Sequence, residues 1–321
     1  MNRKPKTENR KPSLIRIGTR GSKLALAQAN WVKARLEEQH PGLAVELVII
    51  KTSGDKLKDV PLAQLGGKGL FIKEIEEALF AGQVDLAVHS LKDMPAEVPA
   101  GLIIAAVPPR EDCRDAFISN NYATLAAIPP GGRVGTGSLR RRVQLLNLRP
   151  DLEVVPLRGN VDTRLRKLAE EGLDAIILAA AGLARLGLSH VSRDFLSPRD
   201  MLPAISQGAL GLEVRAADTR TREFIAFLDD PVTHAAVTAE RGFLARLEGG
   251  CVVPVAALGS LENDTLDLSA LISDLEGREV LQDRLSGSPE EADAMGRRLA
   301  EILLERGGRK ILQEIFGRPF K

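Results

Sequence analysis

The stretch VGTGSLRRRVQL, residues 134–145, repeats the plan of an earlier stretch, IGTRGSKLALAQ, residues 17–28. In both, a short apolar run enters a Gly-Thr turn, a serine follows, and the pattern continues directly as a helix. A glycine in such a turn lets backbone N–H groups approach a ligand, while the serine caps the helix. The repetition predicts two similar lobes, each with a strand-turn-helix unit.

Both turns suit an anion, because the N-terminus of a helix carries partial positive charge. For either turn alone, capping of the helix by Ser22 or Ser138 is the simpler interpretation. Two such turns facing one cleft would form a binding site instead. The G-x-G-x-x-G pattern of dinucleotide-binding proteins fails here, because GTGSLR ends in arginine.

Short apolar runs alternate with amphipathic stretches along most of the chain. Between residues 14 and 107 the runs LIRI, AVELVII, VDLAV and LIIAAV predict the strands of an α/β layer. Pro108-Pro109 interrupts this pattern, and a second α/β run begins near Arg114. After Pro231, a helix, strand-like runs and a further helix predict a smaller α+β domain.

The first predicted helix ends at Pro41-Gly42. Its residues Leu24, Ala27, Trp31 and Ala34 fall on one face of a 3.6-residue period. We therefore predict that Trp31 lies in the core.

The composition is that of an ordinary globular protein. Of the 321 residues, 44% are hydrophobic and 27% charged, and the length favours about two or three domains. The net charge of +1 gives no long-range field to gather nucleic acid or a membrane surface. Aromatic residues, at 3%, are too few for platforms that stack single-stranded bases. We expect no nucleic-acid partner and no membrane partner.

Several features favour a cytoplasmic protein. No apolar run approaches the roughly 20 residues of a membrane helix. Residues 1–13, MNRKPKTENRKPS, lack the apolar region of a secretory signal, and we interpret them as a disordered tail. Cys113 and Cys251 lie far apart, which argues against a disulfide framework and suits a reducing compartment.

Arginines are concentrated in one part of this nearly neutral chain. Guanidinium groups bind carboxylates through paired hydrogen bonds, so arginine suits a site that orients a small polyanion. We expect about half of them to be solvated or paired with acids, Arg142 and Arg149 first. Arg140, Arg141 and Arg158 follow predicted strand ends and are better candidates for binding. The cluster comprises Arg133, Arg140, Arg141, Arg142, Arg149, Arg158, Arg164 and Arg166, with Arg185 further on.

The segment VDLAVHSLKDMPAEVP, residues 84–99, predicts a buried strand that ends in a proline-bounded loop. Ser90, Lys92 and Asp93 lie just beyond the strand, where open α/β sheets place their ligands. Asp93 is a candidate proton carrier and counter-charge for a cation, although a loop-capping aspartate is the commoner case. We expect His89 to be a hydrogen-bonded structural residue. The 4 histidines show no paired spacing, so no metal site is predicted.

Cys251 lies in EGGC, residues 248–251, between a predicted helix and a strand. The glycines favour an accessible thiol, but a helix C-terminus disfavours the thiolate. Activation would therefore need cations from another domain. For Cys113 we predict a buried, inert thiol.

Taken together and in order, these motifs resemble those of the porphobilinogen deaminase family. The strings that carry the resemblance are IGTRGSKLALAQ, GGKGLF, AVHSLKDMP, VGTGSLRR, LRGNVDTRL, ILAAAGLARLG and LEGGCVVP. It implies an α/β protein: two similar type II periplasmic-binding-protein-like α/β domains with mixed sheets, plus a smaller α+β C-terminal domain. The limits expected are 14–108 with 209–229 for domain 1, 109–208 for the arginine-rich domain 2, and 230–321 for domain 3.

The resemblance also implies a transferase of haem and tetrapyrrole biosynthesis. Cys251 would hold a dipyrromethane cofactor through a thioether. Four porphobilinogen molecules would be added head to tail with loss of ammonia, and hydrolysis would free linear hydroxymethylbilane. Asp93 matches the family's catalytic aspartate, and we expect a monomer.

Every pyrrole unit carries two carboxylates, which would explain the excess of arginine. By resemblance, the cofactor-binding residues are Cys251, Ser90, Lys92, Thr136, Ser138, Arg140, Arg141, Arg158 and Gln207. The substrate-binding residues are Arg20, Ser22, Lys68, Arg164 and Arg185, with Lys68 on a mobile lid. The chain departs from the commoner family pattern at Gly21, at Gly137, where serine is usual, and at Val252. Gly137 puts one contact to a cofactor carboxylate in doubt.

Two other classes of function are compatible with parts of this pattern. A two-lobed small-anion binding protein without catalysis would share the architecture, since a fold does not decide between transport and catalysis. The missing export signal argues against it. A nucleic-acid binder would use the arginine cluster, but the neutral net charge and few aromatic residues oppose it.

Overall fold

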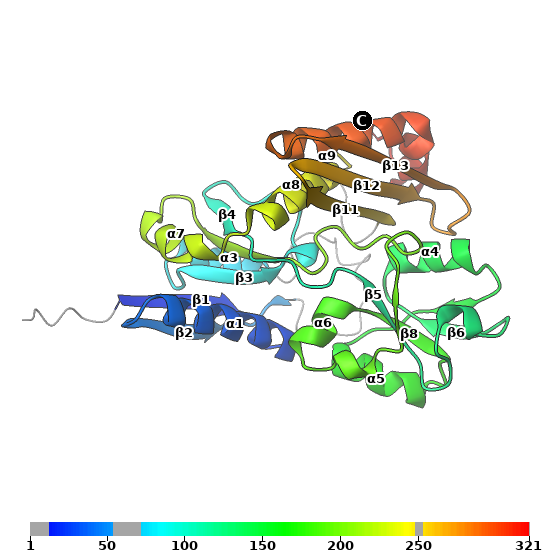
Figure 1. Ribbon diagram of the computed structural model, residues 1–321, viewed down its shortest axis with the longest axis horizontal. Coiled ribbons are helices and arrows are strands. Elements are labelled where there is room, and N and C mark those ends of the chain that lie inside the picture. Colours follow the sequence, from blue (N-terminus) through cyan, green and yellow to red (C-terminus); the bar gives the residue numbers. More distant parts are fainter. Residues whose placement is uncertain (1–12, 54–71, 248–252, 321) are drawn as a thin grey trace, which may run out of the picture.

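The computed structural model describes residues 13–53, 72–247 and 253–320. Within these ranges the chain forms two five-stranded sheets and one three-stranded sheet, each covered by helices (Figure 1). The predicted α/β class with a smaller α+β part is confirmed by this arrangement.

The first sheet has the strand order β2-β1-β3-β10-β4. Strand β1 runs parallel to β2 and β3, whereas β10 runs antiparallel to β3 and β4, so the sheet is mixed. Because β10 comes late in the sequence, the chain leaves this sheet after β4 and returns to it after building the second. The strands are β1 (Ser13–Thr19), β2 (Leu43–Ile49), β3 (Leu86–Ser90), β4 (Leu102–Ala106) and β10 (Leu210–Arg215).

The second sheet repeats this plan in the order β7-β6-β8-β5-β9. Here β6 is parallel to β7 and β8, and β5 is antiparallel to β8 and β9. The two lobes are therefore alike, as the repeated turns predict. The strands are β5 (Asp115–Ile118), β6 (Arg133–Gly135), β7 (Glu153–Val155), β8 (Ala175–Ala179) and β9 (Asp194–Leu196).

Helices follow the strands of both lobes. Ser22 Oγ accepts a hydrogen bond from the Ala25 amide, and Ser138 Oγ accepts one from the Arg141 amide, so both serines cap helices as predicted. The helices are α1 (Lys23–Gln39), α3 (Lys73–Phe80), α4 (Leu139–Leu148), α5 (Val161–Glu170), α6 (Ala180–Arg185) and α7 (Thr219–Ile225). Short 3-10 turns are η2 (Leu91–Asp93), η3 (Leu125–Ala127), η4 (Ser189–Val191), η5 (Ala226–Leu228) and η6 (Pro289–Glu291).

The prediction that Trp31 lies in the core is wrong, because the ring is 43% exposed. Helix α1 instead buries Ala29, Val32 and Leu36 against the first sheet. The helix has two partly apolar stripes, and the one containing Ala29 and Val32 packs on the sheet. Periodicity alone does not show which of the two stripes is buried.

The third part is an antiparallel sheet with two long helices packed on it. In Figure 1 the sheet β11-β12-β13 lies at one end of the molecule, near both lobes, with α8 and α9 side by side. Its core is mostly aliphatic and includes Leu268 and Leu299 packed with Phe243. The elements are α8 (Pro231–Arg246), β11 (Val255–Glu262), β12 (Thr265–Ser273), β13 (Val280–Gly287), α9 (Ala292–Leu303), a π-helical turn (Leu304–Gly308) and α10 (Arg309–Phe316).

Two glycines let α8 and α9 approach closely. A Cβ at Gly296 would lie 2.0 Å from the Ala239 carbonyl oxygen, and one at Gly242 would lie 2.5 Å from the Asp293 carbonyl oxygen. Both distances are far below van der Waals contact, so the two backbones touch at these positions.

We predict that Gly296→Ala lowers the free energy of unfolding by about 1–3 kcal/mol, because the added methyl group forces the helices apart. Gly182→Ala is the control, since a Cβ in α6 would meet its nearest atom at 3.9 Å. That variant should be neutral or slightly more stable, because alanine favours a helix. Thermal denaturation compares them, and equal melting temperatures would contradict the close packing.

Candidate functional site

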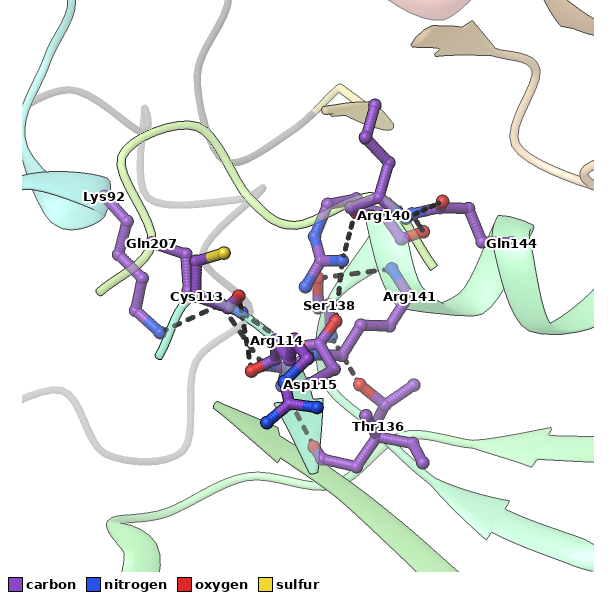
Figure 2. A network of polar contacts seen from close by, with 12 residues as sticks. Lys92, Cys113, Arg114, Asp115, Thr136, Ser138, Arg140, Arg141, Gln144 and Gln207 are labelled. Atoms are coloured by element: carbon purple, nitrogen blue, oxygen red, sulfur yellow. Dashed lines mark hydrogen bonds and ion pairs between the residues drawn. The ribbon is translucent and has the colours of Figure 1, made fainter. Parts of the chain in front are cut away.

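At the centre of the candidate site is a buried carboxylate of the second lobe. Asp115 begins β5, and its side chain has no exposed surface. Arg140 Nη1 donates to Asp115 Oδ2 at 2.8 Å, while Arg141 donates to Oδ1 from Nη2 at 2.8 Å and from Nε at 3.1 Å. Both arginines lie in the first turn of α4, directly after the Thr136–Ser138 turn (Figure 2).

Gln207 connects this carboxylate with the first lobe. Its Nε2 donates to Asp115 Oδ1 and to the Cys113 carbonyl, each at 2.8 Å. Its Oε1 accepts from Lys92 Nζ and from Arg141 Nη2, each at 3.5 Å (Figure 2). Lys92 and Arg141, which come from different lobes, therefore converge on one amide.

The network contains more positive charge than its one carboxylate neutralises. Burial raises the pKa of Asp115, but the charges of Arg140 and Arg141 outweigh this and hold that pKa well below its usual range. Burial lowers the pKa of Arg140, and the neighbouring Arg141 lowers it further, against the opposing effect of Asp115. Within the described residues, Arg140 Nε is buried without a hydrogen-bond partner. An anionic group bound here would neutralise the excess positive charge and would accept a hydrogen bond from Arg140 Nε.

Further cations surround the same place and form no ion pair within the described ranges. Desolvation lowers the pKa of Lys92 to about 8, and in the described chain its ammonium makes one hydrogen bond, the 3.5 Å contact to Gln207. Desolvation followed by the charge of Arg141 lowers the pKa of Arg164 to about 10. Desolvation also lowers the pKa of Arg185, whose Nη2 donates to the Gly208 carbonyl at 2.6 Å.

Asp93 lies at the edge of this cluster, on the 3-10 turn η2 that follows β3. The Leu91 amide donates to the Ala209 carbonyl and the Met94 amide to the Leu91 carbonyl, both at 3.1 Å, so the backbone of the turn is fixed. The carboxylate itself is exposed and makes no hydrogen bond to a residue in the described ranges. Its charge acts electrostatically on Lys92 and on Arg164. The backbone of Asp93 is thus fixed, whereas its carboxylate makes no hydrogen bond in the described chain and acts on two cations.

A narrow space separates the lobes behind this turn. It has a cavity volume of about 20 Å³, enough for about one water molecule, and Ser90, Lys92 and Arg185 line it. Gln28 of α1 also lines it, and its Nε2 donates to Ser90 Oγ at 2.7 Å.

The structure describes most of the remaining predicted residues. Thr136 is buried, and its Oγ1 accepts from the Ser138 amide at 3.2 Å. Arg164 Nε donates to the Gly159 carbonyl at 2.8 Å, and Arg158 acts electrostatically on Arg164. Arg20 and Ser22 lie at the start of α1, where Lys23 Nζ reaches Asp162 Oδ2 of α5 at 2.6 Å. Lys68 and Cys251 fall outside the described residues.

The residues interpreted as structural are confirmed in that role. Arg149 donates to Asp151 Oδ2 at 2.6 Å and to carbonyl groups, and Arg142 donates to the Leu275 carbonyl. His89 Nε2 lies 2.9 Å from Glu213 Oε2 in the interior. Cys113 is only partly buried, so the prediction that its thiol is buried is wrong. Burial nevertheless raises the pKa of the thiol, which agrees with an inert cysteine.

Sequence reasoning missed Asp115 and Glu240. Glu240 Oε1 accepts from Arg110 Nη1 and from the Gly259 amide at 2.8 Å, while Oε2 accepts from the Ser206 amide. Asp115 stands directly before the apolar residues AFI, and Glu240 is the single acid in the stretch PVTHAAVTAERGFLAR. That pattern was the available signal, because a buried charge requires a partner.

Gly137 has a spatial explanation. A Cβ there would lie 2.6 Å from the Leu157 carbonyl oxygen, so the turn before α4 packs directly against the loop that carries Arg158. Gly21 is unconstrained by comparison, since a Cβ would meet Ile49 Cγ2 at 3.4 Å.

Two family models match this chain. One, described as "Porphobilinogen deaminase, dipyromethane cofactor binding domain", matches residues 15–223. The other, "Porphobilinogen deaminase, C-terminal domain", matches residues 234–305. The chain belongs to the porphobilinogen deaminase family.

Individual relatives agree with the deaminase family. The porphobilinogen deaminase of Trichlorobacter lovleyi is 55% identical over 307 residues, which cover 96% of this chain and 98% of that protein. That of Geobacter sulfurreducens is 55% identical over 304 residues, covering 95% of each. Among solved structures, the methionine-binding protein MetQ is 15% identical with a TM-score of 0.44, covering 68% of this chain and 89% of that one.

The deaminase cofactor suits the residues found here. A dipyrromethane carries carboxylate groups, and the cluster offers a buried, unpartnered Arg140 Nε and a desolvated Lys92 ammonium. In the described ranges no group of three or more His, Cys, Asp and Glu side chains is arranged to hold a metal ion. Nor is any described helix long and apolar enough to cross a bilayer.

We predict that Asp115→Asn destabilises the protein by about 3–5 kcal/mol, because two buried guanidinium groups lose their counter-charge. The depressed pKa of Asp115 means that its stabilisation is present above the ordinary aspartate pKa, about 4, and is lost as pH falls below it. Urea denaturation at neutral and acid pH should therefore show a weaker acid dependence in the variant. Asp283→Asn, which removes an exposed partner of Arg306, should change little.

Proposed function

We propose that this protein is a porphobilinogen deaminase that joins four porphobilinogen molecules head to tail into linear hydroxymethylbilane and releases ammonia. The proposal rests on one observation. Cations whose charge is only partly neutralised lie around an acid, Asp93, that makes no hydrogen bond within the described chain. The family assignment supplies the substrate. When bound, a dipyrromethane held by Cys251 supplies the nucleophilic pyrrole end on which the product is built.

The cations bind and orient carboxylates in this proposal. Each pyrrole unit brings an acetate and a propionate, and guanidinium groups hold such groups through charge-assisted hydrogen bonds. Asp115 holds Arg140 and Arg141 from behind, and the Leu202 and Ile177 carbonyls accept further hydrogen bonds from them. Arg140 Nε has no hydrogen-bond partner within the described chain and is the donor that we assign to the ligand. We assign to the cofactor Ser90, Lys92, Thr136, Ser138, Arg140, Arg141, Arg158 and Gln207, and to the substrate Arg20, Ser22, Lys68, Arg164 and Arg185.

Asp93 acts as the acid in this proposal. Departure of ammonia leaves a positively charged pyrrole, and a nearby carboxylate stabilises that charge and the pyrrole N–H group. The same carboxylate then assists proton transfer once the new carbon–carbon bond has formed. Its exposure supports this role, since a capping aspartate would already be engaged with backbone amides.

The setting of the enzyme is also part of the proposal. We propose a cytoplasmic monomer, with porphobilinogen as its small-molecule partner and neither nucleic acid nor membrane as a partner. The domain limits expected from the sequence are kept, and the return of β10 to the first sheet supports placing 209–229 with 14–108. The rival binding protein gains no support from the relatives, which are named as deaminases.

We predict that protein purified from a host that makes porphobilinogen is heavier than its sequence by two pyrrole units and gives a coloured product with Ehrlich's reagent. It should convert porphobilinogen to hydroxymethylbilane. Cys251→Ser should have the unmodified mass and no turnover, because the attachment atom is lost. An unmodified wild-type mass together with no turnover would contradict the proposal.

We predict that Asp93→Asn lowers kcat by about 10²–10⁴-fold while the fold persists, because an amide neither carries the proton nor opposes the positive charge. Glu97→Gln is the matched control, since Glu97 is an exposed acid on the same loop. It should leave kcat unchanged. Turnover of Asp93→Asn near the wild-type rate would remove Asp93 from the mechanism.

A further inference from the structure

The turn that carries Asp93 rests on a helix of the third part of the chain. Leu91 and Met94, on either side of Asp93, are buried in one apolar cluster with Val237 of α8. Ala96, a little further on, packs against the core of the third part. The acid is therefore carried by a turn whose apolar side is buried on α8, although its strand belongs to the first sheet.

Arg241 extends this contact by one turn of the same helix. Residues four apart lie on one face of a helix, so Arg241 follows Val237 along the surface that meets the turn. Arg241 Nη2 donates to the Pro95 carbonyl and to the Ala96 carbonyl, each at 2.8 Å. One guanidinium nitrogen thus holds two consecutive carbonyl groups, those of the second and third residues after Asp93.

The other end of the turn is held by a buried acid. Glu213 of β10 accepts His89 Nε2 at 2.9 Å, and neither side chain is appreciably exposed. Burial lowers the pKa of Arg241, and the charge of Glu213 opposes this effect, so the two groups interact. The segment from His89 to Ala96 is held at its start by Glu213 and at its end by Arg241.

We propose that Arg241 is a positioning residue for Asp93: the guanidinium fixes the Pro95 and Ala96 carbonyls and so sets where the acid stands relative to the cationic cluster. This inference rests on the proposed function, and it adds a residue that touches neither Asp93 nor the cluster. It makes α8 the element that places the acid. Neighbouring Glu240 on α8 holds the Ser206 amide, just before Gln207 of the cationic network, so one helix holds both parts of the site.

The test compares Arg241→Met, which keeps bulk but removes every donor, with Arg241→Lys, which keeps a cation able to donate to both carbonyls. We expect kcat of Arg241→Met to fall about 10–100-fold, the scale of a misplacement of about 1 Å. KM should stay within about twofold, because the ligand-binding cations are untouched. Arg241→Lys should recover most of kcat. Arg297→Met is the control, since Arg297 pairs with Asp293 on the surface of α9.

Hydrogen exchange provides a readout that does not depend on turnover. In Arg241→Met, amide exchange should accelerate in residues 89–98 and stay unchanged in β12 of the third part. If that variant melts below the assay temperature, Arg241→Gln, which retains one amide donor, replaces it. Arg241→Gln should show a smaller decrease in kcat, again with KM within about twofold of the wild-type value.

The outcomes separate the two ideas. A wild-type protein without turnover would remove the proposed function. An active wild type with an Arg241→Met variant of normal kcat, or one that changes KM alone, would overturn the positioning role and leave the function standing. Loss of kcat that Arg241→Lys does not recover, with unchanged exchange in 89–98, would also overturn it.

Discussion

The rest of this site depends on one buried carboxylate that is shared by two guanidinium groups. Removing Asp115, Arg140 and Arg141 from water costs several kcal/mol for each ion, and the arrangement persists only because each ion has charged and hydrogen-bonding partners. One carboxylate against two arginines leaves net positive charge in a medium of low dielectric constant. Lys92 and Arg164 add to it at the cleft. The protein therefore holds a strong local attraction for carboxylates although its net charge is only +1.

The fold supplies this arrangement through strand ends. Asp115 begins β5, the Thr136–Ser138 turn ends β6, and the Asp93 turn ends β3, so side chains distant in sequence meet between two mixed sheets. Helix α8 then holds the parts together, through Glu240 on Arg110 and Ser206 and through Arg241 on the Asp93 turn. The Asp93 turn and the segment that carries Gln207 are thus both tied to one helix of the third part of the chain.

Prediction from the sequence succeeded where the signal was local. The strand-turn-helix units, the capping serines and the pairing of Arg149 with Asp151 involve residues close together in the chain, and all are found. The structural role of His89 was also predicted, but its partner Glu213 lies far away in the sequence and was not. It failed for Trp31, because α1 has two partly apolar stripes and the sheet selects one of them. It missed Asp115 and Glu240, because the hydrogen-bond partners of each lie 19 or more residues away in the sequence, and an acid beside apolar residues does not identify them.

Local residue patterns were sufficient to predict the structural class of each lobe, the turns that suit anions and the cations that could bind carboxylates. This is because propensity, capping and charge are properties of short segments. Three features depend on long-range packing instead. They are the pairing of arginines with Asp115, the contacts of Gln207 with Lys92 and Arg141, and the contact of Arg241 with the Asp93 turn. Contacts of that kind exist only after the two sheets and α8 have been brought together. The charge balance of the cleft, and with it the affinity for a polyanion, is consequently a property of the folded chain.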